Sequence, residues 1–348
     1  MSRILVCGVQ TLYVRGGAEQ LVDTLADKLR AVGGHQVDVV NLPYTDAPRS
    51  QIVKSFLAWR SLNLRSIHEK SVDLLICTKF PSYAASHPNK VVWLTHQHRQ
   101  AYDLYGTRFS DMHTRPDGWL FAWLVRRLDS WGLKDARSLY SISKNTADRL
   151  LRFNGLRAQH LYPPPRLAPM LRCGEYREYL LAVGRFEPIK RFDLILNALA
   201  RTTCGALQCV VVGDGMEGNR LKKLAEELGI QERVRFLGQV DDRELADLYA
   251  NCLGVIYPPY LEDYGYVTVE AFLAHKPVIT TSDAGGVLEF VVDGASGFVA
   301  EPTPEALADA IERLWQQRSD APRLGDEGYQ RVKDISWDNV IGALTSTL

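Results

Sequence analysis

The sequence has few of the features that mark membrane-spanning, secreted or disulfide-stabilised proteins. No apolar run approaches the roughly 18 residues that a membrane-spanning helix requires. The first residues, from Met1 to Val14, lack the long apolar region and the small-residue cleavage site of a secretory signal. The six cysteines are scattered, without a CxxC pair or a histidine at zinc-finger spacing. We therefore expect reduced cysteines and a cytoplasmic location.

A net charge of either sign is also absent, because 41 Lys and Arg balance 41 Asp and Glu. The balance hides a split. Residues 1–165 hold 22 basic and 13 acidic side chains, a net charge of +9, whereas residues 166–348 hold 19 and 28, a net charge of −9. Such asymmetry indicates either that the first half meets an anionic surface or substrate, or that it carries a solvated basic face. No nucleic-acid partner is expected.

The G-x-G-x-x-G fingerprint of dinucleotide-binding domains is missing, since Gly8, Gly16 and Gly17 have the wrong spacing. The order of elements is nonetheless typical of a nucleotide-binding α/β protein. Apolar strand patterns, at residues 3–9, 37–41, 73–78, 90–95 and 138–143, are separated by loops and helical patterns. Gly16 and Gly17, in the loop after the first strand, either allow close approach of the backbone to a ligand or form a flexible turn.

Two helical patterns in the first half are rich in aromatic residues. Residues 51–70 predict a basic amphipathic helix, which fits either an anionic membrane surface or a core-facing helix with a solvated rim. Residues 118–133 predict a core helix that carries Trp119, Phe121, Trp123 and Trp131.

His96 directly follows a buried strand pattern and precedes Gln97 and His98. Side chains just past the carboxyl end of such a strand point into the ligand crevice of a parallel sheet. His96 could therefore hydrogen-bond a sugar hydroxyl or a phosphate. The His-x-His spacing also fits a metal site, but no third ligand follows nearby, so no metal is expected.

The run Tyr162-Pro163-Pro164-Pro165 breaks the pattern and predicts a domain boundary. We expect one domain over residues 1–165 and a second over residues 176–330, which starts with a strand at 179–183. The loop after that strand carries Arg185 and Lys190 and leads into a helix. These two cations could hold a diphosphate.

The most informative stretch is LEDYGYVTVEAFLAH, residues 261–275. Gly265 is expected to end a loop, and a helix is expected to start near Tyr266. The first N–H groups of that helix would be unpaired and would favour a phosphate. Glu262 before the helix and Glu270 on its first turns would stand on opposite sides of that phosphate. A phosphate-linked polyol is the ligand that this spacing suggests.

Several motifs, in this order and spacing, resemble the C-terminal half of the retaining GT-B glycosyltransferases of family 4: GRFEPIK, VVGDG, RFLGQV, the Glu262 and Glu270 pair, and PVITTSDAGGVLEFVVDGASGFV. Residues 179–300 carry the resemblance almost continuously. The first half is similar more loosely, through Gly16-Gly17, His96 and SLYSISKNTADRL, and ISWDNVIGAL resembles the final helix of the family.

The resemblance implies an α/β protein of the GT-B fold, with two Rossmann-like domains whose parallel sheets face a central cleft. Residues 1–165, joined by a C-terminal helix at 336–348, would be the acceptor domain, and residues 176–330 would bind the nucleotide-sugar donor.

The resemblance also implies roles for single residues. Arg185 and Lys190 match the diphosphate-binding cations, Glu270 matches the acid that binds the ribose hydroxyls, and Glu262 matches the acid beside the transferred sugar. The amides of Tyr266 and Val267, after Gly265, would meet the distal phosphate, Val240 would lie beside the base, and His96 would contact the sugar near its reacting carbon. Tyr264 and Tyr266, which would lie beside the donor sugar, depart from the residues that are commonest in the family.

The implied reaction is a retaining, metal-independent hexosyl transfer from a nucleoside-diphosphate sugar to a hydroxyl group, without a cofactor. Glu262 would orient the sugar, and the leaving phosphate would accept the proton of the acceptor. The expected acceptor is a cell-envelope glycolipid or polysaccharide intermediate, met at the inner face of the cell membrane. A nucleotide-sugar 2-epimerase of related fold, a transferase with a small soluble acceptor and a non-catalytic nucleotide-sugar sensor remain alternatives.

Overall fold

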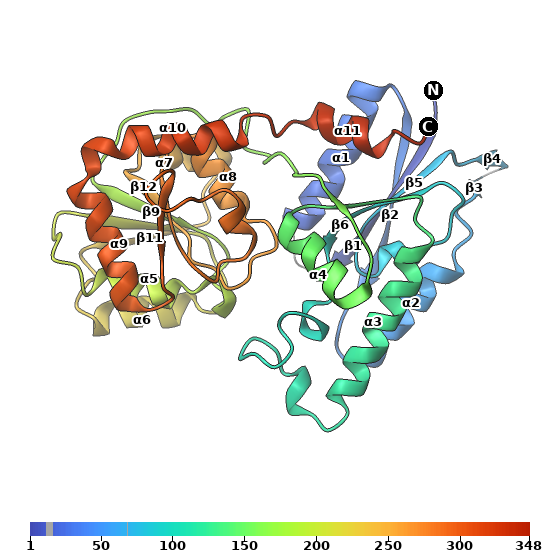
Figure 1. Ribbon diagram of the computed structural model, residues 1–348, viewed down its shortest axis with the longest axis horizontal. Coiled ribbons are helices and arrows are strands. Elements are labelled where there is room, and N and C mark those ends of the chain that lie inside the picture. Colours follow the sequence, from blue (N-terminus) through green and yellow to red (C-terminus); the bar gives the residue numbers. More distant parts are fainter. Residues whose placement is uncertain (12–16, 68) are drawn as a thin grey trace. The chain divides into compact units, whose positions relative to one another are not determined.

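The computed structural model describes residues 1–11, 17–67 and 69–348 (Figure 1). The chain forms two compact units, of which the first contains Met1–Pro164 and Ile335–Leu348 and the second contains Pro165–Asp334. Each unit is built on a six-stranded sheet, and all neighbouring strands in both sheets are parallel. The predicted α/β class is therefore confirmed. None of the helices in the described part of the chain combines the length and the apolar character that crossing a bilayer requires.

The sheet of the first unit has the strand order β2-β1-β5-β6-β7-β8. The strands are β1 (Arg3–Thr11), β2 (Gln36–Tyr44), β5 (Leu74–Lys79), β6 (Lys90–His96), β7 (Ser138–Ser141) and β8 (Gln159–His160). The side chains of Leu74–Cys77 and Val91–Leu94 are completely buried, because helices cover both faces of these central strands. The continuous apolar runs at these positions thus form the predicted central strands.

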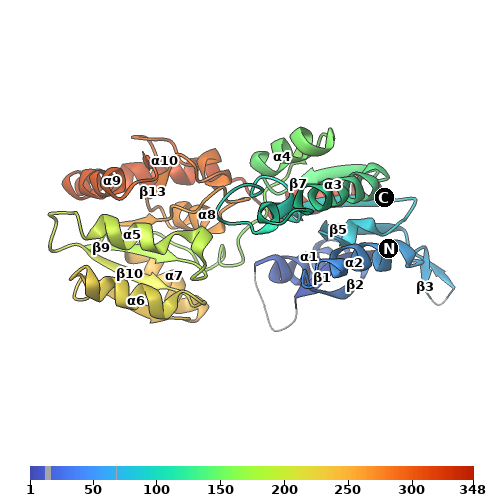
Figure 2. The same ribbon diagram turned by 90° about the horizontal axis from the view of Figure 1, so that it is seen from below.

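Five helices surround this sheet: α1 (Gly17–Gly33), α2 (Ser50–Ser61), α3 (Gly118–Lys134), α4 (Lys144–Asn154) and α11 (Trp337–Leu344). Three short 3₁₀ turns, η1 (Ser82–Ala84), η2 (Arg99–Ala101) and η3 (Met112–Thr114), and a small hairpin of β3 (Ser66–Ile67) and β4 (Lys70–Ser71) complete the described part of the unit. The α11 helix belongs here because the Tyr140 hydroxyl donates to the Ala343 carbonyl at 3.1 Å and the Trp337 ring meets the Trp93 ring edge to face. Both chain ends therefore lie on this unit, as both views show (Figures 1 and 2).

The predicted helix over residues 51–70 is wrong in its second half, because α2 ends at Ser61. Leu62 adopts an extended backbone, and the Asn63 side chain accepts a hydrogen bond from the amide of Arg65, which competes with helical bonding. The inward face of α2 carries Phe56 and Trp59, both buried in the core. These aromatic rings are therefore unavailable to a membrane surface. Of the two alternatives for this segment, α2 fits the second, a core-facing helix with a solvated rim.

The predicted helix is confirmed as α3, but its three tryptophans lie outside the core. Trp119, Trp123 and Trp131 are 66%, 55% and 48% exposed. The face that packs inward carries small and aliphatic residues instead, and a Cβ atom at Gly132 would already lie 3.2 Å from the backbone of η1. Such close helix packing leaves no room for indole rings on that face, so the exposed tryptophans lie on the other side of the helix.

The sheet of the second unit has the order β11-β10-β9-β12-β13-β14. The strands are β9 (Tyr179–Val183), β10 (Gln208–Val212), β11 (Val234–Gly238), β12 (Gly254–Ile256), β13 (Val278–Thr281) and β14 (Gly297–Ala300). The helices are α5 (Phe192–Leu199), α6 (Gly218–Glu227), α7 (Asp242–Asn251), α8 (Tyr266–Leu273), α9 (Pro304–Gln316) and α10 (Ala321–Val332), with 3₁₀ turns η4 (Pro188–Lys190), η5 (Gly286–Glu289) and η6 (Arg318–Asp320). The α5 and α6 helices lie on one face of the sheet and α7, α8 and α10 on the other (Figure 1).

Candidate active site

The candidate site of the second unit is formed by three loops that follow β9, β12 and β13. The chain proceeds from β9 toward β11 in one direction and from β12 toward β14 in the other, so the strand order reverses between β9 and β12. Parallel α/β sheets bind ligands at the carboxyl ends of the strands at such a switch point. Backbone hydrogen bonds join the loops: the Tyr260 amide donates to the Ile189 carbonyl at 2.9 Å, and the Leu261 amide donates to the Asp283 carbonyl at 2.8 Å.

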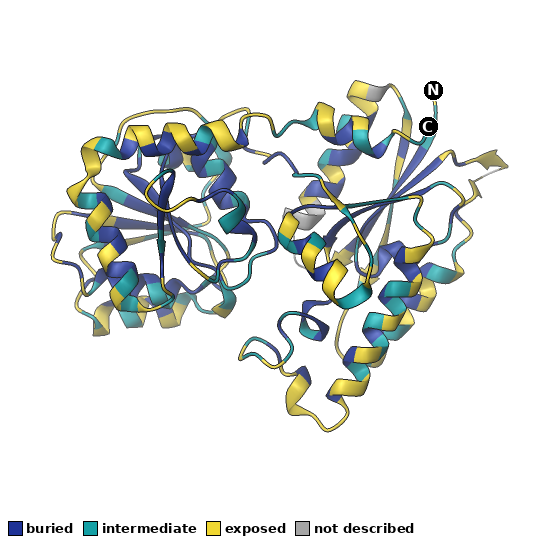
Figure 3. Cartoon of the chain, viewed as in Figure 1, coloured by how far each residue is buried: buried dark blue, intermediate teal, exposed yellow. Residues whose placement is uncertain are grey.

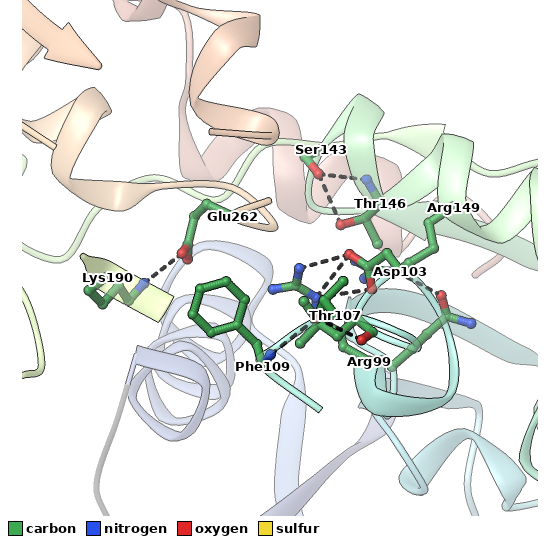
Figure 4. Close-up of polar contacts among 11 residues, drawn as sticks. Arg99, Asp103, Thr107, Phe109, Ser143, Thr146, Arg149, Lys190 and Glu262 are labelled. Atoms are coloured by element: carbon green, nitrogen blue, oxygen red, sulfur yellow. Dashed lines mark hydrogen bonds and ion pairs between the residues drawn. The ribbon is translucent and has the colours of Figure 1, made fainter. Parts of the chain in front are cut away.

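Lys190 and Glu262 form an ion pair between the first two loops. The Lys190 Nζ atom lies 2.6 Å from Glu262 Oε2 and 3.1 Å from the Tyr257 hydroxyl (Figure 4). Burial alone would lower the pKa of Lys190, but the Glu262 carboxylate and the hydrogen bonds to Glu262 and Tyr257 raise it above its usual value. Lys190 therefore stays a cation, available to a phosphate at the carboxyl end of β9.

The two arginines of the first loop have different environments. Arg185 is exposed and pairs with Glu187 at 2.8 Å, so a diphosphate could replace the Glu187 carboxylate as the partner of the Arg185 guanidinium. Arg191 is 5% exposed and adopts a left-handed backbone, with φ of 55°. Its guanidinium donates to the carbonyls of residues 258 and 259, to the Thr281 hydroxyl and to both carboxylate oxygens of Asp283. Arg191 thus holds the three loops together, a role that the sequence analysis missed.

Two glycines bring the third loop against the second. A Cβ atom at Gly285, which has φ of 67°, would lie 2.6 Å from the Glu262 carbonyl oxygen, and one at Gly286 would lie 2.5 Å from the Asp263 carbonyl oxygen. The Gly286 amide donates to the Glu262 carbonyl at 2.8 Å, and the Glu262 amide donates to the Ala284 carbonyl at 3.1 Å. The backbone of Glu262 is thereby fixed from both sides by a loop that tolerates no side chain at these two positions.

The α8 helix begins at Tyr266, as predicted, directly after Gly265. Gly265 has φ of 87° and, among the described residues, no side chain caps this helix end. The amides of Tyr266 and Val267 have no intrahelical acceptor, because the first turn of a helix leaves its N–H groups free, and the helix dipole adds positive potential there. This end of α8 is therefore suited to a phosphate.

Glu270 lies one turn farther along α8, about 6 Å from the helix start at 1.5 Å per residue. The Tyr249 hydroxyl, buried in α7, donates to Glu270 Oε2 at 2.8 Å. Burial raises the pKa of Glu270 to about 7, although the hydrogen bond from Tyr249 and the charge of Arg166 act in the opposite direction. A carboxylate in this position has one oxygen held by Tyr249 and a second oxygen that could accept from hydroxyl groups of a ligand. Tyr249 was not singled out in the sequence.

Two other predicted contacts have contrasting exposure. Val240 is half-buried in the turn between β11 and α7, two residues after the end of β11. Tyr264 is only 2% exposed, and its ring packs edge to face on the rings of Tyr266 and Phe290, at 5.0 and 5.7 Å between centroids. Tyr264 therefore supports the loop from inside, and only its backbone could meet a ligand.

The predicted residues of the first unit are His96, Gly16 and Gly17. His96 is the last residue of β6 and its side chain is exposed. Its backbone carbonyl accepts from the Phe80 amide at 3.0 Å. Gly16 lies outside the described residues, and Gly17 is the first residue of α1. The neighbouring His98 is buried, which lowers its pKa to about 4, so His98 is neutral at physiological pH.

A buried polar network lies behind His96 and was also missed. Gln97 donates to Asn154 at 3.2 Å and accepts from the guanidinium of Arg149 at 3.2 Å. The Tyr102 hydroxyl donates to Asp129 at 2.6 Å, and burial raises the pKa of Asp129 to about 7. Figure 4 shows the adjoining bonds of Arg99 and Arg149 to Asp103. The network fixes Gln97, and therefore the backbone that presents His96.

Within the described residues, no group of three or more His, Cys, Asp or Glu side chains comes together in a way that could hold a metal ion.

Residues 171–331, which contain all three loops, match the family model of "Glycosyl transferases group 1". Residues 171–331 therefore belong to this glycosyltransferase family. A D-inositol 3-phosphate glycosyltransferase from Frankia alni is 36% identical over 172 residues, a match that covers 46% of this chain and 42% of the relative. The match thus spans less than half of the length of this relative.

Solved glycosyltransferase structures share the fold across the whole chain. Sucrose-phosphate synthase from Thermosynechococcus elongatus has a TM-score of 0.77 at 19% identity, covering 99% of this chain and 98% of its own. The Anabaena protein HepE, in complex with UDP and glucose, has a TM-score of 0.71 at 17% identity, covering 100% and 99%. Identities this low show the fold only. The chain therefore has the GT-B fold of these structures.

Proposed function

We propose that this glycosyltransferase moves a sugar from a nucleoside-diphosphate sugar to a hydroxyl acceptor with retention of configuration. The ion pair of Lys190 with Glu262, next to the uncapped start of α8, carries the most weight. It provides one cation and one carboxylate at the end of a helix suited to phosphate. The UDP and glucose bound to the similar HepE structure, and the family assignment, support a sugar nucleotide as donor.

The roles of the groups follow from their chemistry. As the sugar leaves, the bond between its anomeric carbon and the phosphate oxygen breaks and negative charge accumulates on the diphosphate. Lys190, Arg185 and the amides of Tyr266 and Val267 would stabilise that charge. The leaving phosphate oxygen accepts the proton of the acceptor hydroxyl while that oxygen bonds to the anomeric carbon on the same face. Glu262 orients the sugar, and no metal ion is needed in this scheme.

The nucleoside would extend along α8. Glu270, one helical turn from the phosphate, would accept from the ribose hydroxyls, and Val240 would contact the base. His96 of the first unit, together with Gly16 and Gly17, would meet the transferred sugar and the distal part of the donor. In this proposal residues 1–165 with the last helix form the acceptor domain, and residues 176–330 form the donor domain.

We propose a cell-envelope glycolipid or polysaccharide intermediate as acceptor, approached at an anionic membrane surface. The net charge of +9 on residues 1–165 supports an anionic surface or acceptor. A phosphorylated polyol is the acceptor class suggested by the name of the Frankia alni relative, so a soluble acceptor is the main competing hypothesis. These two hypotheses differ in whether lipid is required.

A screen of sugar nucleotides tests the donor site. A ligand at about 100 times its dissociation constant should stabilise the protein by about 2.7 kcal/mol, which thermal unfolding detects. With the best donor, Glu262→Ala and Lys190→Ala should abolish transfer. Lys223→Ala, which removes an exposed cation from α6, serves as the matched control and should leave transfer unchanged. Wild-type turnover in the first two variants would contradict the assignment.

The same incubation separates the alternative enzyme class. A 2-epimerase interconverts sugar nucleotides without any acceptor, whereas a transferase releases the nucleoside diphosphate only as sugar is transferred or slowly hydrolysed. Analysis of the sugar nucleotides after incubation with protein alone therefore distinguishes the two. A donor that binds tightly and remains unchanged with every acceptor class would indicate a sensor.

A further inference from the structure

Exposed tryptophans form a continuous ridge on α3. Trp119, Trp123, Arg127 and Trp131 follow each other at intervals of four residues and are all exposed. Residues spaced in this way lie on one side of a helix. Leu120, which is 49% exposed, and Lys134 widen the same side. We refer to these six residues as the tryptophan ridge.

The orientation of the ridge is fixed by the opposite face of α3. Ala122, Val125 and Leu133 are buried in the core, and Gly132 packs directly on the backbone of η1. A rotation of the helix that buried the indole rings would expose these residues and force Trp131 into the space that Gly132 occupies. The ridge therefore faces away from the core of the first unit, and α3 carries both exposed and buried positions in Figure 3.

The exposed charged residues within α3 are basic, and the acids next to its two ends are each paired with an arginine, Asp117 with Arg49 and Asp135 with Arg60. Arg127 and Lys134 are exposed, whereas Asp129, the sole acidic residue of α3, is fully buried on the other side. Arginine side chains also flank the rings: the Arg127 guanidinium lies 6.0 Å from the Trp123 ring centroid, and the Arg60 guanidinium lies 4.6 Å from that of Trp131. Indole rings next to cations, without exposed acids on the same helix, suit a surface that is apolar and anionic at once.

An anionic lipid surface has this combination. Tryptophan prefers the boundary between headgroups and acyl chains, because its ring is apolar and its N–H remains hydrogen-bonded. Arginine and lysine beside it can reach the lipid phosphates. A second copy of the chain fits less well, since a two-fold contact of this ridge would bring like charges together.

We propose that α3 lies in the plane of an anionic membrane surface, with the indole rings of Trp119, Trp123 and Trp131 in the interface and with Arg127 and Lys134 at the phosphates. This gives the first unit a defined lipid-binding surface on α3, in place of the α2 pattern, whose aromatic rings are buried. The inference deepens the proposed function, since it names the surface through which a lipid-linked acceptor would be reached, but lipid binding itself does not depend on catalysis.

Co-sedimentation of the full-length protein with vesicles tests the proposal. The protein should bind vesicles of phosphatidylcholine and phosphatidylglycerol, bind vesicles of phosphatidylcholine alone more weakly, and release as salt is raised. Trp119→Ala combined with Trp123→Ala, and Arg127→Glu combined with Lys134→Glu, should each lower the partition coefficient by at least about tenfold. Met216→Ala, and Lys222→Glu combined with Lys223→Glu, are the exposed apolar and charge-matched controls on the second unit and should bind as the wild type does.

Three outcomes would overturn the proposal: absence of binding by the wild-type protein, unchanged binding by the ridge variants, and a wild-type dimer in sedimentation velocity that the tryptophan variant converts to a monomer. Far-ultraviolet circular dichroism and thermal unfolding of each variant show that the fold is intact. Sugar-nucleotide binding should be unchanged in the ridge variants. A chain that binds these vesicles through the ridge but binds no sugar nucleotide would refute the proposed function and leave the lipid surface standing.

Discussion

Lys190 and Glu262 lie on different loops of the second unit and meet in an ion pair of 2.6 Å, with both side chains largely removed from solvent. The pair joins the loop after β9 to the loop after β12, and α8 begins four residues beyond Glu262. Each member therefore depends on the other for its position. A ligand phosphate that binds Lys190 would meet a carboxylate already held at hydrogen-bonding distance from the same cation.

Mutational coupling between these two residues should be strong. Lys190→Met should reduce kcat by about 100-fold to 1,000-fold, the usual effect of removing one stabilising donor from a charged transition state. Glu262→Gln should reduce it as well, because the sugar loses its charged partner. The double variant should lose much less than the product of the two single effects, since each single change already disrupts the pair. Independent, multiplicative losses would mean that the two groups act at separate places.

Arg191 should be a stability determinant rather than a member of the reacting groups. Arg191→Met leaves Asp283 without its charged partner, so unfolding free energy should fall by about 3–5 kcal/mol. In a unit of this size that corresponds to a decrease of roughly 10 °C in Tm. Arg201→Met, which removes the exposed pair with Glu305, is the control and should cost at most about 1 kcal/mol. Differential scanning calorimetry measures both.

The close approach of Gly285 to the Glu262 backbone allows a second comparison between two matched variants. Gly285→Ala and Gly294→Ala both place a Cβ on a backbone of positive φ, 67° and 72°, but the added atom meets the Glu262 carbonyl in the first case and open space in the second. Gly294→Ala should lose about 1–2 kcal/mol from backbone strain, and Gly285→Ala should lose more, because its ψ of −125° lies outside the left-handed helical region and its Cβ meets backbone atoms. Only Gly285→Ala should also weaken UDP binding, because Glu262 and the start of α8 must move. Equal effects on binding would contradict the loop geometry.

Donor affinity should depend on the ionisation of Glu270. Its pKa of about 7 means that the carboxylate becomes protonated as pH falls through neutrality and loses acceptor capacity for ribose hydroxyls. The dissociation constant of UDP, measured by calorimetry, should therefore rise as pH falls from about 8 to about 6. In Glu270→Gln only the titration of the ligand phosphate should remain. Tyr249→Phe should shift the Glu270 transition to higher pH, because it removes a hydrogen bond that favours the carboxylate.

The stability of the second unit should show the opposite pH dependence. A carboxyl group whose pKa is raised in the folded state holds a proton that the unfolded chain releases, so its contribution is fully present below the ordinary carboxyl pKa of 4.5 and is lost as pH rises through about 7. Urea unfolding of the wild type and of Glu270→Gln across this range measures the difference. A pH profile unchanged by the substitution would contradict the raised pKa of Glu270.

Much of the second unit could be predicted because its local signals agree with one another. The strand at 179–183 and the start of α8 at Tyr266 coincide with the prediction, since an apolar run bounded by glycine leaves few alternatives. The role of Arg191 could not be predicted in the same way. Lys190 and Arg191 are adjacent cations in one loop, and only the left-handed backbone at Arg191 directs the second one into the protein. That turn depends on loops distant in sequence.

The errors in the first unit have a common physical origin. The α3 segment has apolar residues on two faces, so periodicity identifies the helix without deciding which face is buried. Packing decided it, because the small residues at 122 and 132 allow a close approach that indole rings would prevent. In α2 the helical pattern continues past Ser61, but the Asn63 side chain accepts a hydrogen bond from the Arg65 amide, and the chain then forms the hairpin of β3 and β4. Neither the close packing of α3 nor the hydrogen bond of Asn63 can be read from the pattern of apolar and charged residues.

The return of α11 to the first unit means that the second unit is an insertion. Residues 165–334 are joined to the first unit by two connections, at Pro164–Pro165 and Asp334–Ile335, so the two units do not simply follow one another along the chain. A protein shortened to end near residue 334 would therefore destabilise the first unit, although the deleted residues follow the second unit in sequence. The deletion would remove the contacts of α11 with Trp93 and Tyr140. The second unit, by contrast, is one continuous segment that could be produced separately without the loss of any of its own elements. Residues 165–334 are therefore the natural fragment for studying donor binding in isolation.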